Sequence, residues 1–282
     1  MFAQFGCGQG PGGASRANTE GEQAVSTGKP VSVPKTVLAN KFGFLSGHAS
    51  ESGRIKEFGG LWARPHPGPF LWDSMQEEAG GPFLFSGTDE LVEGNQDAGV
   101  GTLVTIWPFA EWDQLSRGDA EECAVSDQDE FLPKGGLGGP PDYLPEHRCN
   151  PADWEAYAAW LAAVVERYDG DGEEDMPGLK IPIKYWEVMN EPDLEAPPED
   201  QGSERLDFYK EDSGAYKELL VKSAKAIKKA DPDAAVLIAG AAGGNARFLG
   251  FYRAVFGDPE AVAAFDIANV HCISNDDFGS FN

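Results

Sequence analysis

Residues 180–194, KIPIKYWEVMNEPDL, run from an apolar strand into an abrupt polar turn. β-Branched and aromatic residues fill the stretch up to Met189, which is typical of a buried strand. Asn190 and Glu191 follow at once, and Pro192 cannot continue a central strand. The pattern therefore predicts a strand over residues 181–189 that presents an amide and a carboxylate at its carboxyl end.

Five further segments have the character of strands, and helical patterns separate most of them. They lie at residues 40–46, 60–64, 100–107, 234–242 and 265–273. Strands that alternate with helices indicate an α/β protein with a parallel sheet covered by helices. Six such units in series favour a (β/α)8 TIM barrel over an open sheet. No Gly-x-Gly-x-x-Gly motif follows the first strand to support dinucleotide binding.

Closing such a barrel takes eight strands, and the chain shows about six of the eight βα units. We therefore expect residues 36–282 to form an incomplete barrel, truncated after the sixth strand. Residues 1–35 are polar and rich in glycine, and we expect a flexible leader or linker there. Cys7 in this leader resembles the lipid-anchor cysteine of a lipoprotein signal whose front is missing. The leader can equally be a disordered segment without a targeting signal.

Helix boundaries follow from capping residues. Thr88 is expected to cap a helix that ends near residue 98. Asn150, which is followed by proline, is expected to cap the strongest helix of the chain. Asp212 or Ser213 is expected to cap a third helix over about residues 215–229. One face of the helix after Asn150 is expected to pack in the core, through Tyr157, Trp160, Leu161, Val164 and Val165.

Charge and hydropathy exclude several classes of partner. The 282 residues carry a formal net charge of -25, which disfavours binding to the phosphate backbone of nucleic acids. No apolar run approaches the roughly 18 residues that a membrane-spanning helix needs. We therefore expect neither nucleic acid nor a membrane span, and no feature of the sequence bears on the oligomeric state.

The chain has four cysteines, Cys7, Cys123, Cys149 and Cys272, without the Cys-x-x-Cys spacing of a zinc site. Cys123 and Cys149 flank a loop rich in glycine and proline. They form a disulfide if the protein is exported, and two free thiols are an equal alternative. Export, to the cell exterior, the periplasm or a lipid anchor at Cys7, is the expected localisation, with a cytoplasmic location as the alternative.

Polar and aromatic side chains recur where the expected strands end, which is the active-site face of such barrels. The candidates are Arg64, His66, Trp107, Glu111, Asn190, Glu191 and His271. Glu191 is the central one, because partial desolvation at the mouth of an apolar barrel favours a neutral acid that can donate a proton to a leaving oxygen. Asn190 and Glu191 would face opposite ways in a regular strand, so we expect a twist or bulge there.

Glu187 lies four residues before Glu191 and therefore points to the same side of the strand, into the barrel. A buried charge needs a partner. We predict an ion pair between Glu187 and Arg64, which ends another strand.

The acidic turn YDGDGEED, residues 168–175, has the oxygen-rich look of a calcium loop. No glutamate stands at the twelfth position counted from Asp169, so the EF-hand pattern is incomplete. We favour a solvated turn, and expect no metal and no organic cofactor.

The segments WARPHPGPFLWD and YWEVMNEPD resemble the large clan of retaining glycosidases built on (β/α)8 barrels, in which Asn-Glu-Pro ends strand four. The sequence pattern of these two segments is most similar to that of the β-xylosidase and α-L-iduronidase family. The resemblance extends over roughly residues 42–273. It implies a glycoside hydrolase that acts on a β-linked plant or algal oligo- or polysaccharide.

Position by position, the resemblance implies a role for each candidate. Glu191 matches the general acid/base, and Asn190 the residue that binds the sugar 2-hydroxyl. Arg64 matches the arginine that supports the catalytic carboxylates, and His271 a position near the nucleophile. The remaining candidates, Trp107, Glu111 and His66, are expected to line the sugar cleft, although His66 can equally order its own loop.

The family's nucleophile is a glutamate at the end of strand seven, and no such strand is recognisable here. We therefore expect the 282-residue chain to lack hydrolase activity and the full-length parent to have it. The alternative is a carbohydrate-binding barrel without catalysis. An unrelated barrel lyase or aldolase is disfavoured, because no lysine and no metal cluster stands at a strand end.

Overall fold

The computed structural model describes residues 41–45, 49–125, 144–194, 208–242 and 246–271. The expected leader, with Cys7, lies outside these residues, as do Cys272 and most of the long loop after Cys123. The division of the chain at residue 36 therefore stays a prediction.

The strands are short and all pair in parallel. They are β1 Gly43–Leu45, β2 Trp62–Arg64, β3 Gly101–Thr102, β4 Val104–Ile106, β5 Tyr185–Val188 and β6 Ala235–Ile238. The order is β1-β2-β3 in one sheet and β4-β5-β6 in another, and Leu103 alone separates β3 from β4. Beyond β6, parallel bridges join Leu237 to Ile267 and Ala241 to Val270.

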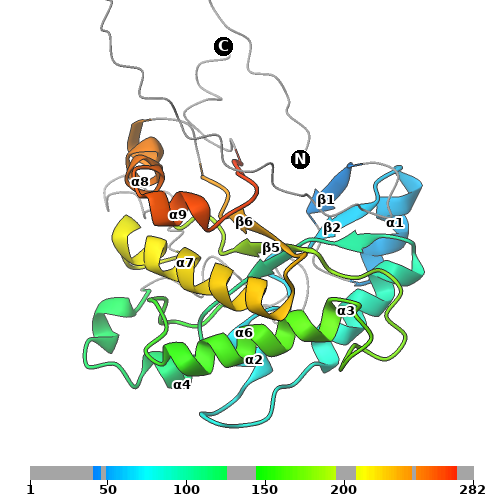
Figure 1. Cartoon of the computed structure of the whole chain (residues 1–282), viewed down its shortest axis with the longest axis horizontal. Coiled ribbons are helices and arrows are strands. Elements are labelled where there is room, and N and C mark those ends of the chain that lie inside the picture. Colours follow the sequence, from blue (N-terminus) through cyan, green and yellow to red (C-terminus); the bar gives the residue numbers. More distant parts are fainter. Residues whose placement is uncertain (1–40, 46–48, 126–143, 195–207, 243–245, 272–282) are drawn as a thin grey trace, which may run out of the picture.

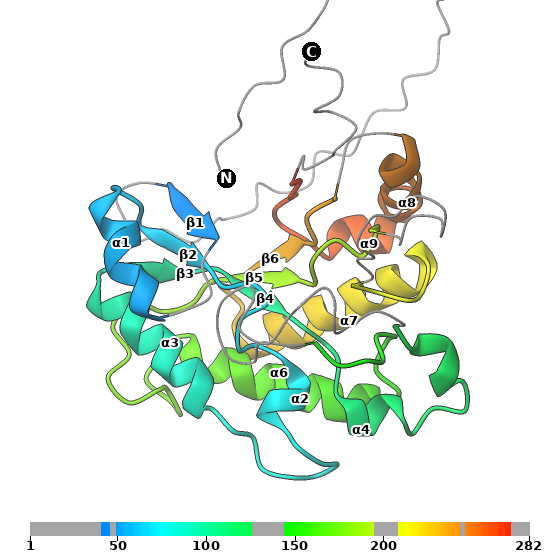
Figure 2. The same ribbon diagram turned by 180° about the vertical axis from the view of Figure 1, so that it is seen from behind.

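Each expected strand position therefore holds a strand or, for residues 265–273, isolated bridges in place of a regular strand. The strands follow one another in chain order, without the reversal that a doubly wound sheet shows at its switch point. In Figures 1 and 2 the helices α3 (Ser86–Asp97), α6 (Trp154–Tyr168) and α7 (Ser213–Ala230) lie along one side of the strands. This is the arrangement of consecutive βα units, and the number of units in the complete barrel stays a prediction.

The helices cover the outer side of the strands. The α-helices are α1 Ser52–Glu57, α2 Trp72–Met75, α3 Ser86–Asp97, α4 Glu111–Gln114, α6 Trp154–Tyr168, α7 Ser213–Ala230, α8 Ala246–Phe256 and α9 Pro259–Ala263, with short 3-10 turns η1 Ala49–Glu51 and η2 Ala120–Cys123. None of the helices in the described part of the chain combines the length and the hydropathy needed to cross a bilayer.

The core face expected on α6 is confirmed. Tyr157, Trp160, Leu161, Val164 and Val165 are all buried in the main hydrophobic cluster. The cluster also includes residues of β4, β5, β6 and α7, so this face packs between the strands and the neighbouring helix. These side chains recur with the 3.6-residue period of an α-helix, which places them on one face that can be buried.

Two of the three expected caps are wrong. Helix α3 begins at Ser86, and the Thr88 hydroxyl inside its first turn donates to the carbonyl of Phe85. Helix α6 begins at Trp154, where the carboxylate of Asp153 accepts from two backbone N–H groups. The third expectation is confirmed, because Asp212 caps α7 in the same way.

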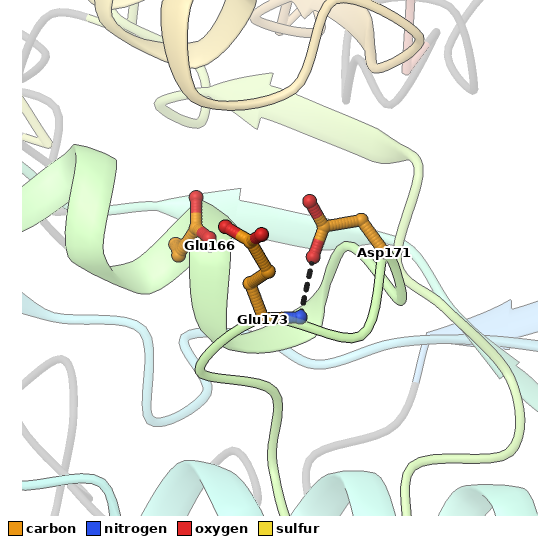
Figure 3. A group of neighbouring side chains, drawn as sticks. All are labelled: Glu166, Asp171 and Glu173. Carbon is orange, nitrogen blue, oxygen red and sulfur yellow. Dashed lines mark hydrogen bonds between the residues drawn. The ribbon is translucent and has the colours of Figure 1, made fainter.

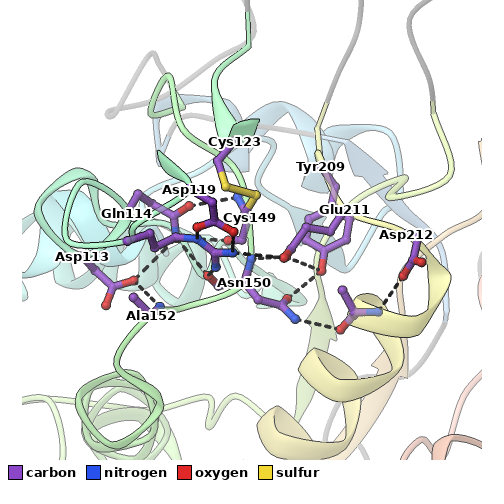
Figure 4. Close-up of polar contacts among 12 residues, drawn as sticks. Asp113, Gln114, Asp119, Cys123, Cys149, Asn150, Ala152, Tyr209, Glu211 and Asp212 are labelled. Carbon is purple, nitrogen blue, oxygen red and sulfur yellow. Dashed lines mark hydrogen bonds and ion pairs between the residues drawn. A yellow bond between two sulfur atoms is a disulfide. The ribbon is translucent and has the colours of Figure 1, made fainter. Parts of the chain in front are cut away.

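Asn150 is engaged elsewhere, which explains why it does not cap α6. Its Oδ1 accepts from the hydroxyl of Tyr209, and its Nδ2 donates to the carbonyl of Ala215 in α7. Its backbone N–H donates to Glu211 (Figure 4). The residue therefore ties the segment after the long loop to the start of α7.

Cys123 and Cys149 form a disulfide, which resolves the two alternatives left open by the sequence. Figure 4 shows it beside the polar network around Asn150. Backbone hydrogen bonds run in both directions across this pair of segments, from Val125 N to Glu146 O and from Arg148 N to Cys123 O. The disulfide therefore fixes the two ends of the long loop against each other.

Replacing both cysteines with serine is expected to lower the free energy of unfolding by about 3 kcal/mol. The bond closes a loop with a sequence separation of 26, and losing that constraint raises the entropy of the unfolded chain. Urea denaturation of the double variant and of the reduced wild-type chain measures the effect. A loss below about 1 kcal/mol would contradict a structural role for the bond.

Candidate active site

The end of β5 leaves regular strand geometry, which brings consecutive side chains to one side. Met189 has φ 72° and Glu191 φ 44°, both in the left-handed region that L residues rarely adopt. The expected departure from alternation is thus present as two left-handed residues around Asn190. Such strained positions persist only where surrounding contacts over-determine them.

Glu187 is the buried centre of the site, with no solvent exposure at all. Its Oε2 pairs with Arg64 Nε at 2.6 Å and accepts from Thr105 Oγ1 at 2.8 Å. Its Oε1 accepts from Asn269 Nδ2 at 2.6 Å and from the backbone N–H of Gly240 at 3.2 Å. The predicted ion pair with Arg64 is confirmed, and four donors share the charge of one carboxylate.

Arg64 connects this buried pair to Asn190. While its Nε pairs with Glu187, its NH2 donates to Asn190 Oδ1 at 2.8 Å. All three side chains are buried. The guanidinium therefore fixes the orientation of the Asn190 amide, with the Nδ2 group turned away from the arginine.

Glu191 lies against His271. The distance from Glu191 Oε1 to His271 Nδ1 is 2.6 Å, and the two side chains are 13% and 16% exposed. The other ring nitrogen of His271 lies 3.9 Å from Glu187 Oε1. Glu191 therefore has a polar partner, whereas the sequence suggested only an apolar mouth.

Gly240 makes the place of the His271 ring possible. A Cβ atom on Gly240 would lie too close to Nε2 of His271 for a non-bonded contact, so this position admits glycine alone while the ring stays where it is. The backbone N–H of His271 also donates to the carbonyl of Ala241 at 2.9 Å. The segment after β6 thus holds the histidine at both its ring and its backbone.

Asp193, two residues past Glu191, is 3% exposed. Both of its carboxylate oxygens lie 3.1 Å from the backbone N–H of Ala242. Burial raises the pKa of Asp193 to about 6, and the charge of Glu191 acts in the same direction, against these hydrogen bonds.

The pKa of Asp193 predicts a pH dependence of stability. A carboxyl whose pKa is raised on folding binds its proton more tightly in the folded state. Its stabilising contribution is therefore complete below its ordinary value of 3.8 and is lost as the pH rises through about 6. Relative to wild type, Asp193→Asn should gain about 3 kcal/mol between pH 3.8 and pH 7, measured by urea denaturation at both values. A constant difference between variant and wild type would contradict this.

His66 and Trp107 are packed inside the protein. Trp107 has no exposed surface, and its indole N–H donates to the carbonyl of Pro67. The rings of Trp107 and Phe208 lie against His66. Burial, with the nearby charges of Arg64 and His271, lowers the pKa of His66 to about 3, so its imidazole is neutral. Trp107 therefore offers no face for stacking on a sugar, contrary to expectation, because the loop after β2 covers it.

Glu111 opens helix α4 and pairs with His147, with Glu111 Oε1 2.6 Å from His147 Nδ1. Its Oε2 is buried without a hydrogen-bond partner in the described part of the chain. Its backbone N–H donates to Asp73. No contact joins this pair to Glu191 among the described residues, so Glu111 belongs to a separate polar cluster.

Four polar residues of these clusters were not predicted from the sequence: Thr105, Asp193, Asn269 and His147. Strand parity could have found two of them, because Thr105 lies two residues before Trp107 and Asn269 two before His271. Asp193 is in a turn and His147 forms an isolated antiparallel bridge with Ala124, so no periodicity of a strand or helix applies to either. Their positions depend on the disulfide and on the segment after β6.

The acidic turn after α6 brings several carboxylates close together, as Figure 3 shows for Glu166, Asp171 and Glu173. The backbone of the turn donates to its own acids: Asp171 N to Asp169, and Glu173 N to Asp171. Both Gly170 N and Gly172 N donate to Asp175. These bonds are those of a self-capped turn, and the expectation that it binds no metal stays a prediction.

No protein-family model and no curated protein matches the chain. Solved structures with a similar fold include a family 39 glycoside hydrolase from Bacteroides cellulosilyticus (16% identity, TM-score 0.44), covering 79% of this chain. A glucosidase from Croceicoccus marinus (15%, TM-score 0.49) and a monomeric β-xylosidase from Caulobacter crescentus (20%, TM-score 0.49) each cover 81%. The chain spans 35%, 42% and 41% of the lengths of these three structures, respectively.

Proposed function

We propose that the chain carries the acid/base half of a glycoside hydrolase site and that the protein hydrolyses O-glycosidic bonds. The observation that carries this is the arrangement at the end of β5. Glu191 is part-exposed and hydrogen-bonded to His271, while its neighbour Asn190 is oriented by Arg64. An oriented amide beside a reachable carboxyl group is what a sugar and its leaving oxygen require.

The chemistry assigns one task to each group. Glu191 protonates the leaving oxygen as the glycosidic bond breaks. His271 stabilises the carboxylate that remains, by donating from Nδ1–H to Oε1 of Glu191. Asn190 donates from Nδ2 to a sugar hydroxyl, and Arg64 keeps that amide in place.

The mechanism is proposed to be retaining, which needs a second carboxylate about 5–5.5 Å from the first. Among the described residues, two other carboxylates belong to the cluster around Glu191. Glu187 has no exposed surface and four donors, and Asp193 is closed against Ala242. Neither can attack a sugar. The nucleophile is therefore proposed to lie outside the described residues. We also propose that these 282 residues alone turn over aryl glycosides negligibly, because the family resemblance places the nucleophile on a seventh strand.

Affinity labelling tests the proposal without needing the nucleophile. In a bromoacetyl glycosylamine the sugar carries an alkylating group where the leaving group would lie. The Glu191 carboxylate displaces bromide and forms an ester, which peptide mass spectrometry locates. We expect labelling at Glu191 that free sugar suppresses, across a panel of xylose, glucose and galactose derivatives.

Two variants give the contrast. Glu191→Gln should lose the label, whereas Glu218→Gln, at a half-exposed carboxylate on α7 paired with Lys222, should react as wild type does. Equal, sugar-insensitive labelling at both positions, or none at Glu191 with any sugar, would reject the proposal. Rapid aryl glycoside turnover abolished by Glu191→Gln would keep the acid/base role and overturn the expected inactivity.

A carbohydrate-binding barrel without catalysis remains the second candidate, because the same contacts hold a sugar without breaking it. A longer chain that binds and labels but never hydrolyses would favour it. We further propose a β-linked saccharide substrate, close in kind to those of the β-xylosidase and α-L-iduronidase family. Export is proposed too, supported by the disulfide between Cys123 and Cys149, since such bonds persist in oxidising compartments.

A further inference from the structure

The mechanism above gives no task to Asp193, a buried carboxylate of the site. We propose that Asp193 is a positioning residue for Glu191, because its carboxylate fastens the turn that carries Glu191 to the segment after β6, which also hydrogen-bonds the backbone of His271. The proposal rests on the proposed function only in that Glu191 is the reacting group. The hydrogen bonds that support it are present in the folded chain whether or not Glu191 acts on a sugar.

The first of these contacts is local. The backbone N–H of Leu194 donates to the carbonyl of Glu191 at 3.0 Å, so residues 191–194 close a turn. Asp193 lies inside that turn, and its two oxygens converge on Ala242 N. Moving Asp193 therefore moves the backbone of Glu191.

Residues 240–242 each form a hydrogen bond with a different group of the site. Gly240 N donates to Glu187, Ala241 O accepts from His271 N, and Ala242 N donates to Asp193. Three consecutive residues thus set the positions of the buried centre, the histidine and the Glu191 turn. The hydrogen bonds between Asp193 and Ala242 link the turn that carries Glu191 to these three residues.

The left-handed backbone around Glu191 needs support, and the hydrogen bonds between Asp193 and Ala242 can supply it. Left-handed conformations at Met189 and Glu191 cost on the order of 1–3 kcal/mol each and need support from their surroundings. The carboxylate of Asp193 bonds just beyond the second of them. Without this acceptor, the turn can relax and carry the Glu191 carboxyl group away from His271 Nδ1.

Several titratable groups surround Asp193. Glu191 and His271 act on it directly by charge, and Tyr216 of α7 and Tyr252 of α8 are coupled to it. Burial raises the pKa of both tyrosines, so they are neutral where Asp193 titrates. Protonated Asp193 keeps one acceptor oxygen, and an asparagine there keeps one as well.

The test compares Asp193→Asn, which keeps an acceptor, with Asp193→Ala, which has none. The matched control is Asp231→Ala. Asp231 is also buried and accepts from the backbone N–H of Asp233, but it precedes β6 at the opposite end of the strand. The first measurement is the rate at which the bromoacetyl glycosylamine labels Glu191. The second is the amide resonance of Ala242 followed against pH by NMR.

We expect Asp193→Ala to slow labelling about tenfold or more, because a displaced reacting group loses its alignment. Asp193→Asn should label within about twofold of wild type, and Asp231→Ala should do the same. The Ala242 amide resonance should shift with a midpoint near pH 6 in wild type and stay constant in Asp193→Asn.

Wild-type labelling rates in Asp193→Ala would overturn the proposal, and so would an asparagine variant as slow as the alanine one. If no variant is labelled, the proposed function fails and NMR alone decides. The positioning role then stands if the Ala242 resonance titrates and Asp193→Ala, unlike Asp231→Ala, shifts the Glu191 amide. It falls if either effect is missing.

Discussion

Replacing Arg64 with methionine is expected to lower the free energy of unfolding by about 3–5 kcal/mol. Methionine fills the space of the arginine stem but leaves Glu187 as a buried carboxylate without its cation. Thr105, Asn269 and Gly240 still donate to Glu187, yet none of them carries a positive charge. The measurement is urea denaturation at pH 7.

Two further variants locate the cause of this loss. Lys180→Met breaks the exposed ion pair with Asp97 and should cost at most about 1 kcal/mol. Combining Arg64→Met with Glu187→Gln should recover part of the loss, because a neutral amide needs no counter-charge. A single Arg64→Met variant as stable as wild type would show that the ion pair with Arg64 does not stabilise the folded chain.

The second large effect is expected from Gly240→Ala, which should reduce the labelling rate of Glu191 about a hundredfold. The added Cβ would lie too close to Nε2 of His271 for a non-bonded contact, so the ring must shift from its position against Glu191. Overpacking of this kind also costs about 1–3 kcal/mol of stability. The rate should therefore fall in protein that is still folded.

The control for this variant is Gly250→Ala in α8. A Cβ there meets nothing within 4 Å, and alanine favours a helix, so stability should stay constant or rise. Labelling of Glu191 should be unchanged. If Gly240→Ala labels as fast as wild type while remaining folded, the contact with His271 has no part in the reactivity of Glu191.

Periodicity accounts for the parts of this structure that could be predicted. Alternation in the strand before Asn190 placed Glu187 on the inner side, and its burial then demanded a cation, which is Arg64. The order of the strands followed from their alternation with helices. In each case the residue spacing itself carries the geometry.

Contacts between distant segments account for the parts that could not. Asn150 has the right type to cap α6, but Tyr209 and Ala215 compete for its side chain, and Asp153 caps instead. Trp107 stands at a strand end like a cleft residue, yet the carbonyl of Pro67 binds its indole N–H inside the core. Neither partner is visible in the local sequence.

The most direct test of the central claim is a crystal structure of the chain with a bound iminosugar, a cationic mimic of a sugar ring. The account predicts density for the ring beside Glu191 and Asn190, with the Glu191 carboxylate within hydrogen-bond distance of the ligand and still in contact with His271. A ligand bound elsewhere, or a Glu191 side chain turned to the outer surface, would contradict it.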